Sequence, residues 1–167
     1  DLQPAFVSDA GRYALNLLVR LYREAAPKEL SGWHYDQVAA HFLAGKAAMT
    51  TDWPGSWHTY VASPIVGETF DLALYPRGPA GLRRVYSGGH SFALTAGCRD
   101  VPAALELLRF LTGETSQTHE ARLGSVVPRT RALQIVKGEA TPGSRAARRW
   151  EILEQTMREC MAVPPKF

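Results

Sequence analysis

The stretch of residues 35–61 most constrains the fold of this chain, because two kinds of apolar pattern follow each other there. Apolar side chains recur at helical spacing from Tyr35 to Phe42, and Gly45 suits the end of a helix. The uncharged run 47–51 then predicts a short buried strand, and the breaker-rich residues 52–56 predict a turn. A helix, a strand and a turn in this order are typical of an α/β sheet, in which strand ends present ligand sites.

Two tryptophans, Trp53 and Trp57, flank the predicted turn. Large aromatic side chains at such a place suit a ligand platform, and they suit packing in a core or at a domain interface as well. Trp53 precedes Pro54, which favours extended backbone, so we expect Trp53 to point into the sheet. Trp57 follows the turn, and we expect its ring to face a cleft.

The remaining chain alternates predicted helices with extended segments. Alternating apolar residues predict strands over 70–75 and 91–96, and the pair Gly88-Gly89 before the second of these permits either a plain turn or a close approach to the backbone. Caps, breakers and helical spacing predict helices over 9–25, 53–61, 101–112, 114–123 and 131–137, and a last helix that starts at Thr141 and Pro142 and ends before Pro164. Two of these helices have predicted buried faces, formed by Ala104, Leu107, Leu108 and Leu111 and by Trp150, Leu153, Met157 and Met161.

Composition limits the class of protein. Of the 167 residues 46% are apolar and 21% charged, and no apolar run reaches the length of a membrane span, which argues against disordered, fibrous and membrane-spanning chains. The net charge of +3 is small and the basic residues are scattered, apart from Arg145, Arg148 and Arg149, so we expect no nucleic-acid partner. Cys98 and Cys160 could form a disulfide or remain buried thiols, and we expect that they do not define the fold.

Sequence motifs for covalent chemistry are absent. The chain has no GxSxG, HExxH, CxxC or GxGxxG motif and no phosphate loop, and its five histidines lack the spacing of metal ligands. Asp52, Glu68 and Asp71 could supply the two carboxylates of a glycosidase, but their spacing equally suits solvated loop residues. We therefore expect a protein without a cofactor or a catalytic metal that is not an enzyme.

The order of several short motifs resembles the sugar-binding solute receptors of ABC importers, the maltose-binding-like family. The resemblance runs from about residue 8 to residue 135. It rests on Phe42-Leu-Ala-Gly-Lys-Ala-Ala-Met49, Trp53-Pro-Gly-Ser-Trp57, Tyr75-Pro76, Gly78-Pro79, Gly88-Gly89, the helix Ala103–Thr112, Gln117, Gly124 and Pro128-Arg129. Gly113-Glu114 departs from the Ser-Pro that often starts the corresponding helix in that family.

The resemblance implies an α/β fold of the periplasmic binding protein type, a partial two-lobed fold that is helix-rich with short strands. This chain would correspond to the C-terminal half of such a receptor. Residues 1–87 would then belong to the second lobe, residues 88–130 would cross to the first lobe, and residues 131–167 would return as helices to the second lobe. Because the other half of the receptor is missing from this correspondence, we expect exposed apolar surface, which a homodimer of the fragment could cover.

The resemblance also implies the function. The protein would bind a sugar or oligosaccharide between two lobes and deliver it to a membrane permease, in the periplasm or outside the cell and possibly with a lipid anchor. The expected ligand-binding residues are Trp57, Trp53, Asp52, Gly88, Gly89, His90 and Arg129, with His58 as a further polar candidate. The alternatives are a receptor of the same fold for a non-sugar ligand such as a glycerol phosphate, for which Arg83, Arg84 and Arg129 would suit the anion, a carbohydrate-active enzyme, or a helical interaction module without ligand.

Overall fold

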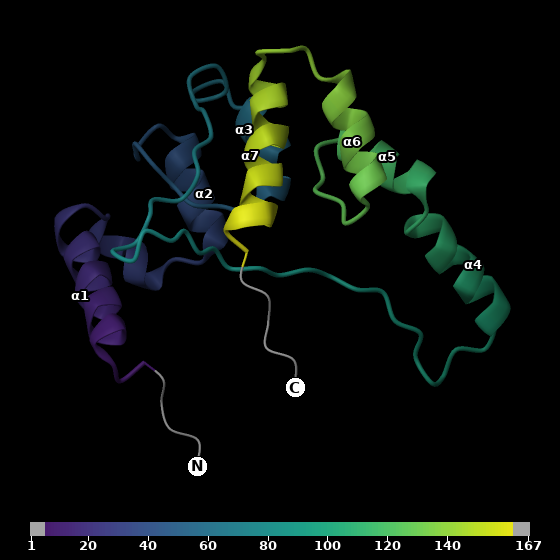
Figure 1. Cartoon of the computed structure of the whole chain (residues 1–167), viewed down its shortest axis with the longest axis horizontal. Helices are drawn as coiled ribbons and strands as arrows, with labels where there is room; N and C mark the ends of the chain where they lie inside the picture. Colours follow the sequence, from purple (N-terminus) through teal and green to yellow (C-terminus); the bar gives the residue numbers. More distant parts are fainter. Residues whose placement is uncertain (1–5, 162–167) are drawn as a thin grey trace. The chain divides into compact units, whose positions relative to one another are not determined.

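Helices carry the regular structure of the computed structural model, which describes residues 6–161 (Figure 1). The chain forms two units, Asp1–Asp52 and Trp53–Phe167. The first unit holds α1 (Asp9–Glu24), the 3₁₀ helix η1 (Lys28–Gly32) and α2 (Tyr35–Leu43). The second holds the 3₁₀ helix η2 (Pro54–Ser56), α3 (Trp57–Val61), α4 (Val101–Leu111), α5 (Glu114–Arg122), α6 (Thr130–Glu139) and α7 (Arg145–Glu159).

Helix α1 begins at the predicted cap and leaves its apolar face uncovered. The Ser8 hydroxyl oxygen accepts a hydrogen bond from the backbone N–H of Gly11 at 3.1 Å, which satisfies one of the orphan donors at the helix start. No residue of α1 is buried, and Leu15 and Leu18 are 63% and 64% exposed. The prediction of exposed apolar surface is therefore confirmed for this helix.

Helix α2 also has the predicted bounds. The backbone N–H of His34 donates to Oε1 of Gln37 at 2.9 Å, which closes the start of the helix from the third helical position. Gly45 follows the helix with φ of 70°, the left-handed conformation in which glycine ends helices at little cost. Within this unit the Trp33 ring lies on the His41 ring, with 4.9 Å between their centroids.

The core of the second unit lies among α5, α6 and α7. Helix α5 packs on α6, and α6 packs on α7 (Figure 1). Helices α6 and α7 bring apolar residues to one cluster, to which α5 adds Ala121 and the loop after α5 adds Val127. The buried members of the cluster are Ala121, Val127, Ala132, Val136 and Trp150, with Leu133, Ala140 and Leu153 packed against them.

Helices α4 and α7 differ from the sequence prediction in their buried faces, and α7 also in its start: Met157 and Met161, predicted to be buried with Trp150, are each 40% exposed, and Met161 lies beyond the helix. Helix α4 has the predicted Asp100 cap, which accepts from the N–H of Ala103 at 3.0 Å, but none of its residues is buried, so its predicted buried face is wrong within the described residues. The last helix begins after Ser144 and not at Thr141, because Gly143 turns the chain with φ of 75° and the Ser144 hydroxyl then caps the helix. Pro164 lies outside the described residues.

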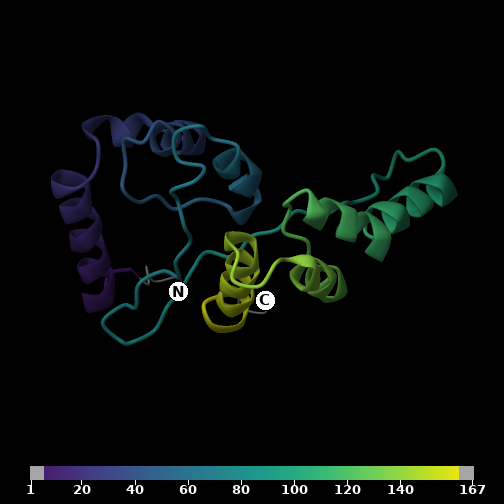
Figure 2. The same cartoon turned by 90° about the horizontal axis from the view of Figure 1, so that it is seen from above.

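The predicted short strands are wrong. Residues 47–51, 70–75 and 91–96 form no strand, and the segment from Phe70 to Asp100 follows a path without regular structure (Figure 2). A strand needs a neighbour for its backbone groups, and among the residues described here Val85 pairs with Met161 in a single parallel bridge. The described residues are therefore helix-rich, as expected, and lack the short strands of the expected α/β fold.

Arginine side chains of α7 hold part of this extended segment in place of a sheet. Arg145 donates to the carbonyl oxygen of Phe70 at 3.1 Å and lies over its ring at 4.6 Å. Arg148 forms an ion pair with Asp71 at 3.0 Å and donates to the carbonyl oxygen of Leu72 at 3.3 Å. The backbone of residues 70–72 thus obtains partners from side chains, because no neighbouring strand supplies them.

Two further points concern domains and membranes. The assignment of residues 1–87, 88–130 and 131–167 to lobes stays a prediction.

None of the helices within residues 6–161 combines the length and the apolar character that a membrane crossing requires.

Candidate functional site

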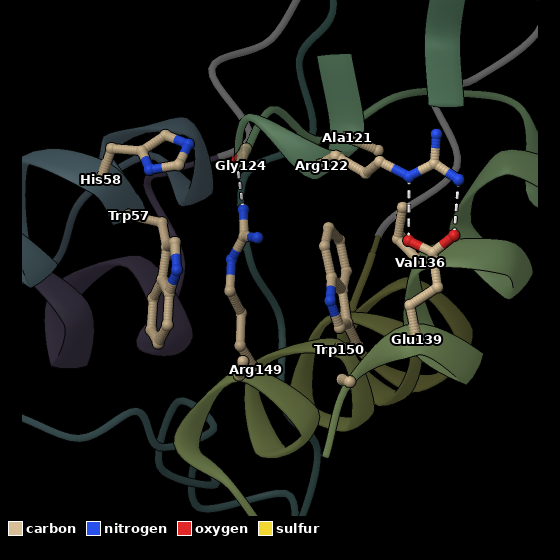
Figure 3. A pocket seen from close by; sticks show the side chains of 11 residues that line it. Trp57, His58, Ala121, Arg122, Gly124, Val136, Glu139, Arg149 and Trp150 are labelled. Atoms are coloured by element: carbon tan, nitrogen blue, oxygen red, sulfur yellow. Dashed lines mark hydrogen bonds and ion pairs between the residues drawn. The ribbon is translucent and has the colours of Figure 1, made fainter. Parts of the chain in front are cut away.

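A cavity of about 200 Å³ opens in the second unit, between α3, the end of α5, α6 and α7 (Figure 3). Its wall is partly aromatic, partly apolar and partly charged. Trp57 and His58 come from α3, and the rest of the wall is formed by Ala121, Arg122, Gly124, Val136, Glu139, Ala140, Ala146, Arg149 and Trp150. Trp57, one of the expected ligand-binding residues, and His58, the further polar candidate, therefore line the same cavity as residues much later in the sequence.

Arg149 is the central side chain of this cavity. Its guanidinium carbon lies 5.1 Å from the centroid of the Trp57 ring and 4.2 Å from that of Trp150, so the cation is held between two aromatic faces (Figure 3). Its Nη2 donates to the carbonyl oxygen of Pro54 at 3.1 Å and to that of Gly124. A planar guanidinium suits this arrangement because it stacks on rings and donates in its own plane.

Burial changes the acid–base property of this group. Arg149 is 3% exposed, and the loss of hydration lowers the pKa of its guanidinium to about 10. The side chain is still charged near neutral pH, since that pKa lies well above 7. The cavity therefore contains a buried positive charge.

The close approach of the His58 imidazole to the backbone at position 124 explains why that residue is glycine. Gly124 has φ of 92°, and a Cβ atom added to it would lie 2.3 Å from Nε2 of His58. Figure 3 shows the imidazole of His58 beside Gly124 at the rim of the cavity. Only glycine fits, because a side chain would combine backbone strain with overlap on the ring.

On the opposite side of the cavity an ion pair is complete. Arg122 on α5 donates from Nε and Nη2 to the two carboxylate oxygens of Glu139 on α6, at 2.9 Å and 2.5 Å (Figure 3). This bidentate hydrogen bonding holds the pKa of Glu139 below its usual range and raises the pKa of Arg122. The two side chains compensate each other, so neither leaves an unbalanced charge in the wall.

Of the two tryptophans of the turn, Trp57 lines the cavity, as expected for a ring that faces a cleft, and Trp53 does not point into a sheet. Trp57 is partly buried, with its ring packed edge-on against Phe70 at 5.4 Å and against Arg149 on a face. Trp53 is 53% exposed and packs edge-on against Tyr86 at 5.6 Å. Trp53 is the more exposed of the two side chains, because no sheet forms among the described residues to cover it.

The other predicted site residues lie in three places. Gly88 lies against the ring of Tyr86, from which a Cβ atom on Gly88 would be 2.9 Å away. Gly89 and His90 follow in the same segment and are exposed. Arg129 donates from Nε to the carbonyl oxygen of Thr112, at the junction of α4 and α5. None of these residues lines the cavity, and Asp52 is the exposed last residue of the first unit.

The arginines that the alternative anion receptor would use are engaged with backbone. Arg83 donates from Nε to the carbonyl oxygen of Tyr75 at 2.6 Å, and Arg84 donates to that of Arg83 at 3.0 Å. Within residues 6–161, no group of three or more histidine, cysteine or acidic side chains is arranged to hold a metal ion. Arg149 is therefore the most deeply buried positive charge near the candidate ligand residues.

Sequence reasoning missed Arg149 and Trp150 as site residues. The signal that could have found Arg149 is its position four residues before Leu153, on the side of the last helix that carries the apolar stripe. A charged residue on the buried face of a helix must find partners for its charge, because burying a charge without partners is costly.

Comparisons with known proteins support the resemblance at the level of the solute-binding family. The model of a family described as bacterial extracellular solute-binding protein matches residues 1–118. A curated relative from Deinococcus radiodurans, named "Probable ABC transporter-binding protein", is 30% identical over 120 residues, which cover 69% of this chain and 28% of the relative. The chain thus spans about 28% of the length of that relative, and no solved structure matches it. Because the family model matches well over half of the residues, this chain belongs to the bacterial extracellular solute-binding proteins.

Proposed function

We propose that this chain is part of the substrate-binding component of an ABC importer, and that the complete protein binds a sugar or oligosaccharide between two lobes. The family match over residues 1–118 carries the receptor part of the proposal, and the name of the Deinococcus relative supports it. The receptor works in the periplasm or outside the cell and delivers its ligand to a membrane permease.

Aromatic surface supports the choice of a sugar. Sugar rings carry C–H groups on their faces that pack on flat apolar rings, and their hydroxyl groups need polar partners or their desolvation is uncompensated. Trp53 offers a ring that is 53% exposed, with Tyr86 at its edge. Trp57 offers the part of its ring that lines the cavity, with His58 beside it as a polar partner.

A binding screen on the full-length protein tests this proposal. Isothermal titration calorimetry with neutral mono- and oligosaccharides, and with glycerol phosphate as the non-sugar alternative, should find binding of a sugar. The same samples should release no reducing sugar over time, since a binding protein performs no hydrolysis. Failure of every sugar to bind, or steady release of reducing sugar, would contradict the proposal.

Substitution of the two tryptophans tests the placement of the site. We expect Trp57→Ala to weaken sugar binding at least tenfold and to lower the melting temperature, because the ring also packs on Phe70 and Arg149. Trp53→Ala should weaken binding with little change in melting temperature, since half of its side chain is exposed. Tyr13→Ala is the matched control, because Tyr13 is 51% exposed and lies on α1. Affinities like that of the Tyr13 variant in both tryptophan variants would place the sugar elsewhere.

A further inference from the structure

Arg149 is a buried positive charge without an acidic partner. Its side chain is 3% exposed, and among the described residues no carboxylate lies within ion-pair distance of it. Two aromatic faces and two carbonyl oxygens stabilise the cation in part. Proteins ordinarily bury a charge only with an opposite charge or a bound ion, so this arrangement lacks a negative group.

The guanidinium also has hydrogen-bond donors left over. An arginine side chain carries five N–H groups, and Arg149 uses two of them, both on Nη2. In the described part of the chain, the unpartnered side-chain nitrogen and oxygen atoms that are sealed from solvent are Oε1 of Gln117 and Oγ1 of Thr118. The Nε and Nη1 groups of Arg149 are therefore not completely sealed from solvent, and the residue that carries them lines the cavity.

The other charges of the cavity wall do not supply the missing partner. Glu139, the one carboxylate in that wall, accepts from Arg122 with both of its oxygens. The wall thus holds two guanidinium groups against one carboxylate, and the unbalanced one is the more deeply buried. The cavity beside Arg149 has a volume of about 200 Å³, whereas sites for drug-sized ligands begin at roughly 300 Å³. The cavity therefore suits one charged group of a ligand and not a whole oligosaccharide.

We propose that this cavity is an anion subsite, in which one of the unused N–H groups of Arg149, on Nη1 or on Nε, donates to an oxyanion group of the transported ligand, a carboxylate or a phosphate. The inference rests on the transport part of the proposed function and specifies a ligand with an oxyanion group, which is an acidic sugar if the sugar proposal holds and a phosphorylated polyol if it fails. Trp57 and Trp150 hold the guanidinium in one plane, so the donors are oriented before the ligand arrives. A charge-assisted hydrogen bond in such a partly dehydrated place is stronger than a neutral one.

Matched ligand pairs on the unmodified full-length protein test the inference directly. The pairs are galactose with galacturonate and glycerol with glycerol 3-phosphate, measured by isothermal titration calorimetry at low ionic strength, with inorganic phosphate as a separate probe. We expect the acidic member of one pair to bind at least tenfold more tightly than its neutral counterpart, and that pair then identifies the source of the oxyanion.

The outcomes separate this inference from the proposed function. If neutral and acidic sugars bind equally well, the sugar receptor stands and the anion subsite is refuted. If glycerol 3-phosphate binds tightly and no sugar does, the anion subsite stands and the sugar proposal fails. If no member of either pair and no inorganic phosphate binds, the subsite is refuted.

A pair of arginine variants tests the residue. Arg149→Met keeps much of the length of the side chain and removes the charge, and it should abolish the preference for the acidic ligand. Arg145→Met is the matched control, because Arg145 lies on the same helix, over the ring of Phe70 at 4.6 Å, and does not line the cavity. A preference that persists in the Arg149 variant refutes the assignment. Should that variant not fold, the comparison of matched ligands on the unmodified protein still decides the proposal.

Discussion

Replacement of Gly124 by alanine adds one carbon atom at the rim of the cavity. The geometry around that atom lets us calculate the expected loss in the free energy of unfolding. Gly124 has φ of 92°, a conformation that L-residues other than glycine rarely adopt. The new Cβ atom would lie 2.3 Å from Nε2 and 2.6 Å from Cδ2 of His58, well inside van der Waals contact. Either the backbone or the imidazole must therefore move.

Two terms contribute to the expected loss of stability. Holding alanine in a left-handed conformation costs about 1–2 kcal/mol. Because His58 is an exposed side chain, its ring can turn away, and an unfavourable side-chain torsion costs about 0.5–1.5 kcal/mol. We therefore expect Gly124→Ala to lower the free energy of unfolding by about 1.5–3.5 kcal/mol in total.

Gly143→Ala separates the two terms. Gly143 has a similar φ of 75°, in the same unit, but a Cβ atom there would meet nothing within 4 Å. This control should lose only the backbone term. The double variant Gly124→Ala/His58→Ala should recover the difference between the two single glycine variants, because the overlapping ring is gone.

The assay is urea denaturation of the full-length protein, followed by tryptophan fluorescence, since Trp57 and Trp150 line the same cavity. Gly124→Ala should be half unfolded at a lower urea concentration than Gly143→Ala. The slope of the unfolding free energy against urea concentration should be the same in both variants. If the two variants unfold at the same midpoint, or if His58→Ala brings no recovery, the close approach of His58 to Gly124 is not part of the folded protein and the rim of the cavity is wrongly described.

Three further predictions concern other parts of the chain. Because Arg122 holds the pKa of the Glu139 carboxyl below its usual range, that pair stabilises the fold at pH values above this range and ceases to do so as pH falls; Glu139→Gln should therefore make the urea midpoint less sensitive to acid between about pH 5 and pH 3. Both cysteines are free, so reduction should not change the mass, and iodoacetamide should label partly exposed Cys98 in the folded protein but fully buried Cys160 only after unfolding. Asp100→Ala should weaken the start of α4 by about 1 kcal/mol, seen as faster amide hydrogen exchange in its first turn, and unchanged exchange would contradict the cap.

Local signals predicted the helices, and the predictions that needed a distant partner were wrong. Ser8, Asp100 and the glycines at positions 45 and 124 act within a few residues of their own place, so the sequence alone predicts the ends that they mark. Alternating apolar residues over 70–75 predict a strand only if another strand lies beside them. In the described residues this segment meets arginine side chains of α7 instead, and a period-2 pattern carries no information about such a partner.

The sequence also predicted some features of the candidate site and not others. Trp57, His58 and Gly124 stand out in the sequence by residue type and by position in a motif, but nothing local predicts that a glycine 66 residues after His58 will come to lie against its ring. Trp53 and Trp57 were assigned opposite environments because the argument assumed a sheet. Without that sheet, the exposed ring is the one before the proline.

The charge in the cavity comes from outside the residues that define the family. The family model matches residues 1–118, which include Trp57 and His58, whereas Gly124, Arg149 and Trp150 follow later in the chain. The aromatic wall of the cavity is therefore built partly from the matched segment and its positive charge from the segment after it. On the proposed assignment, a receptor built in this way keeps an aromatic surface for a sugar ring, while Arg149 selects the charged group that the ligand carries. The matched-ligand measurements therefore test a residue that the family match does not include.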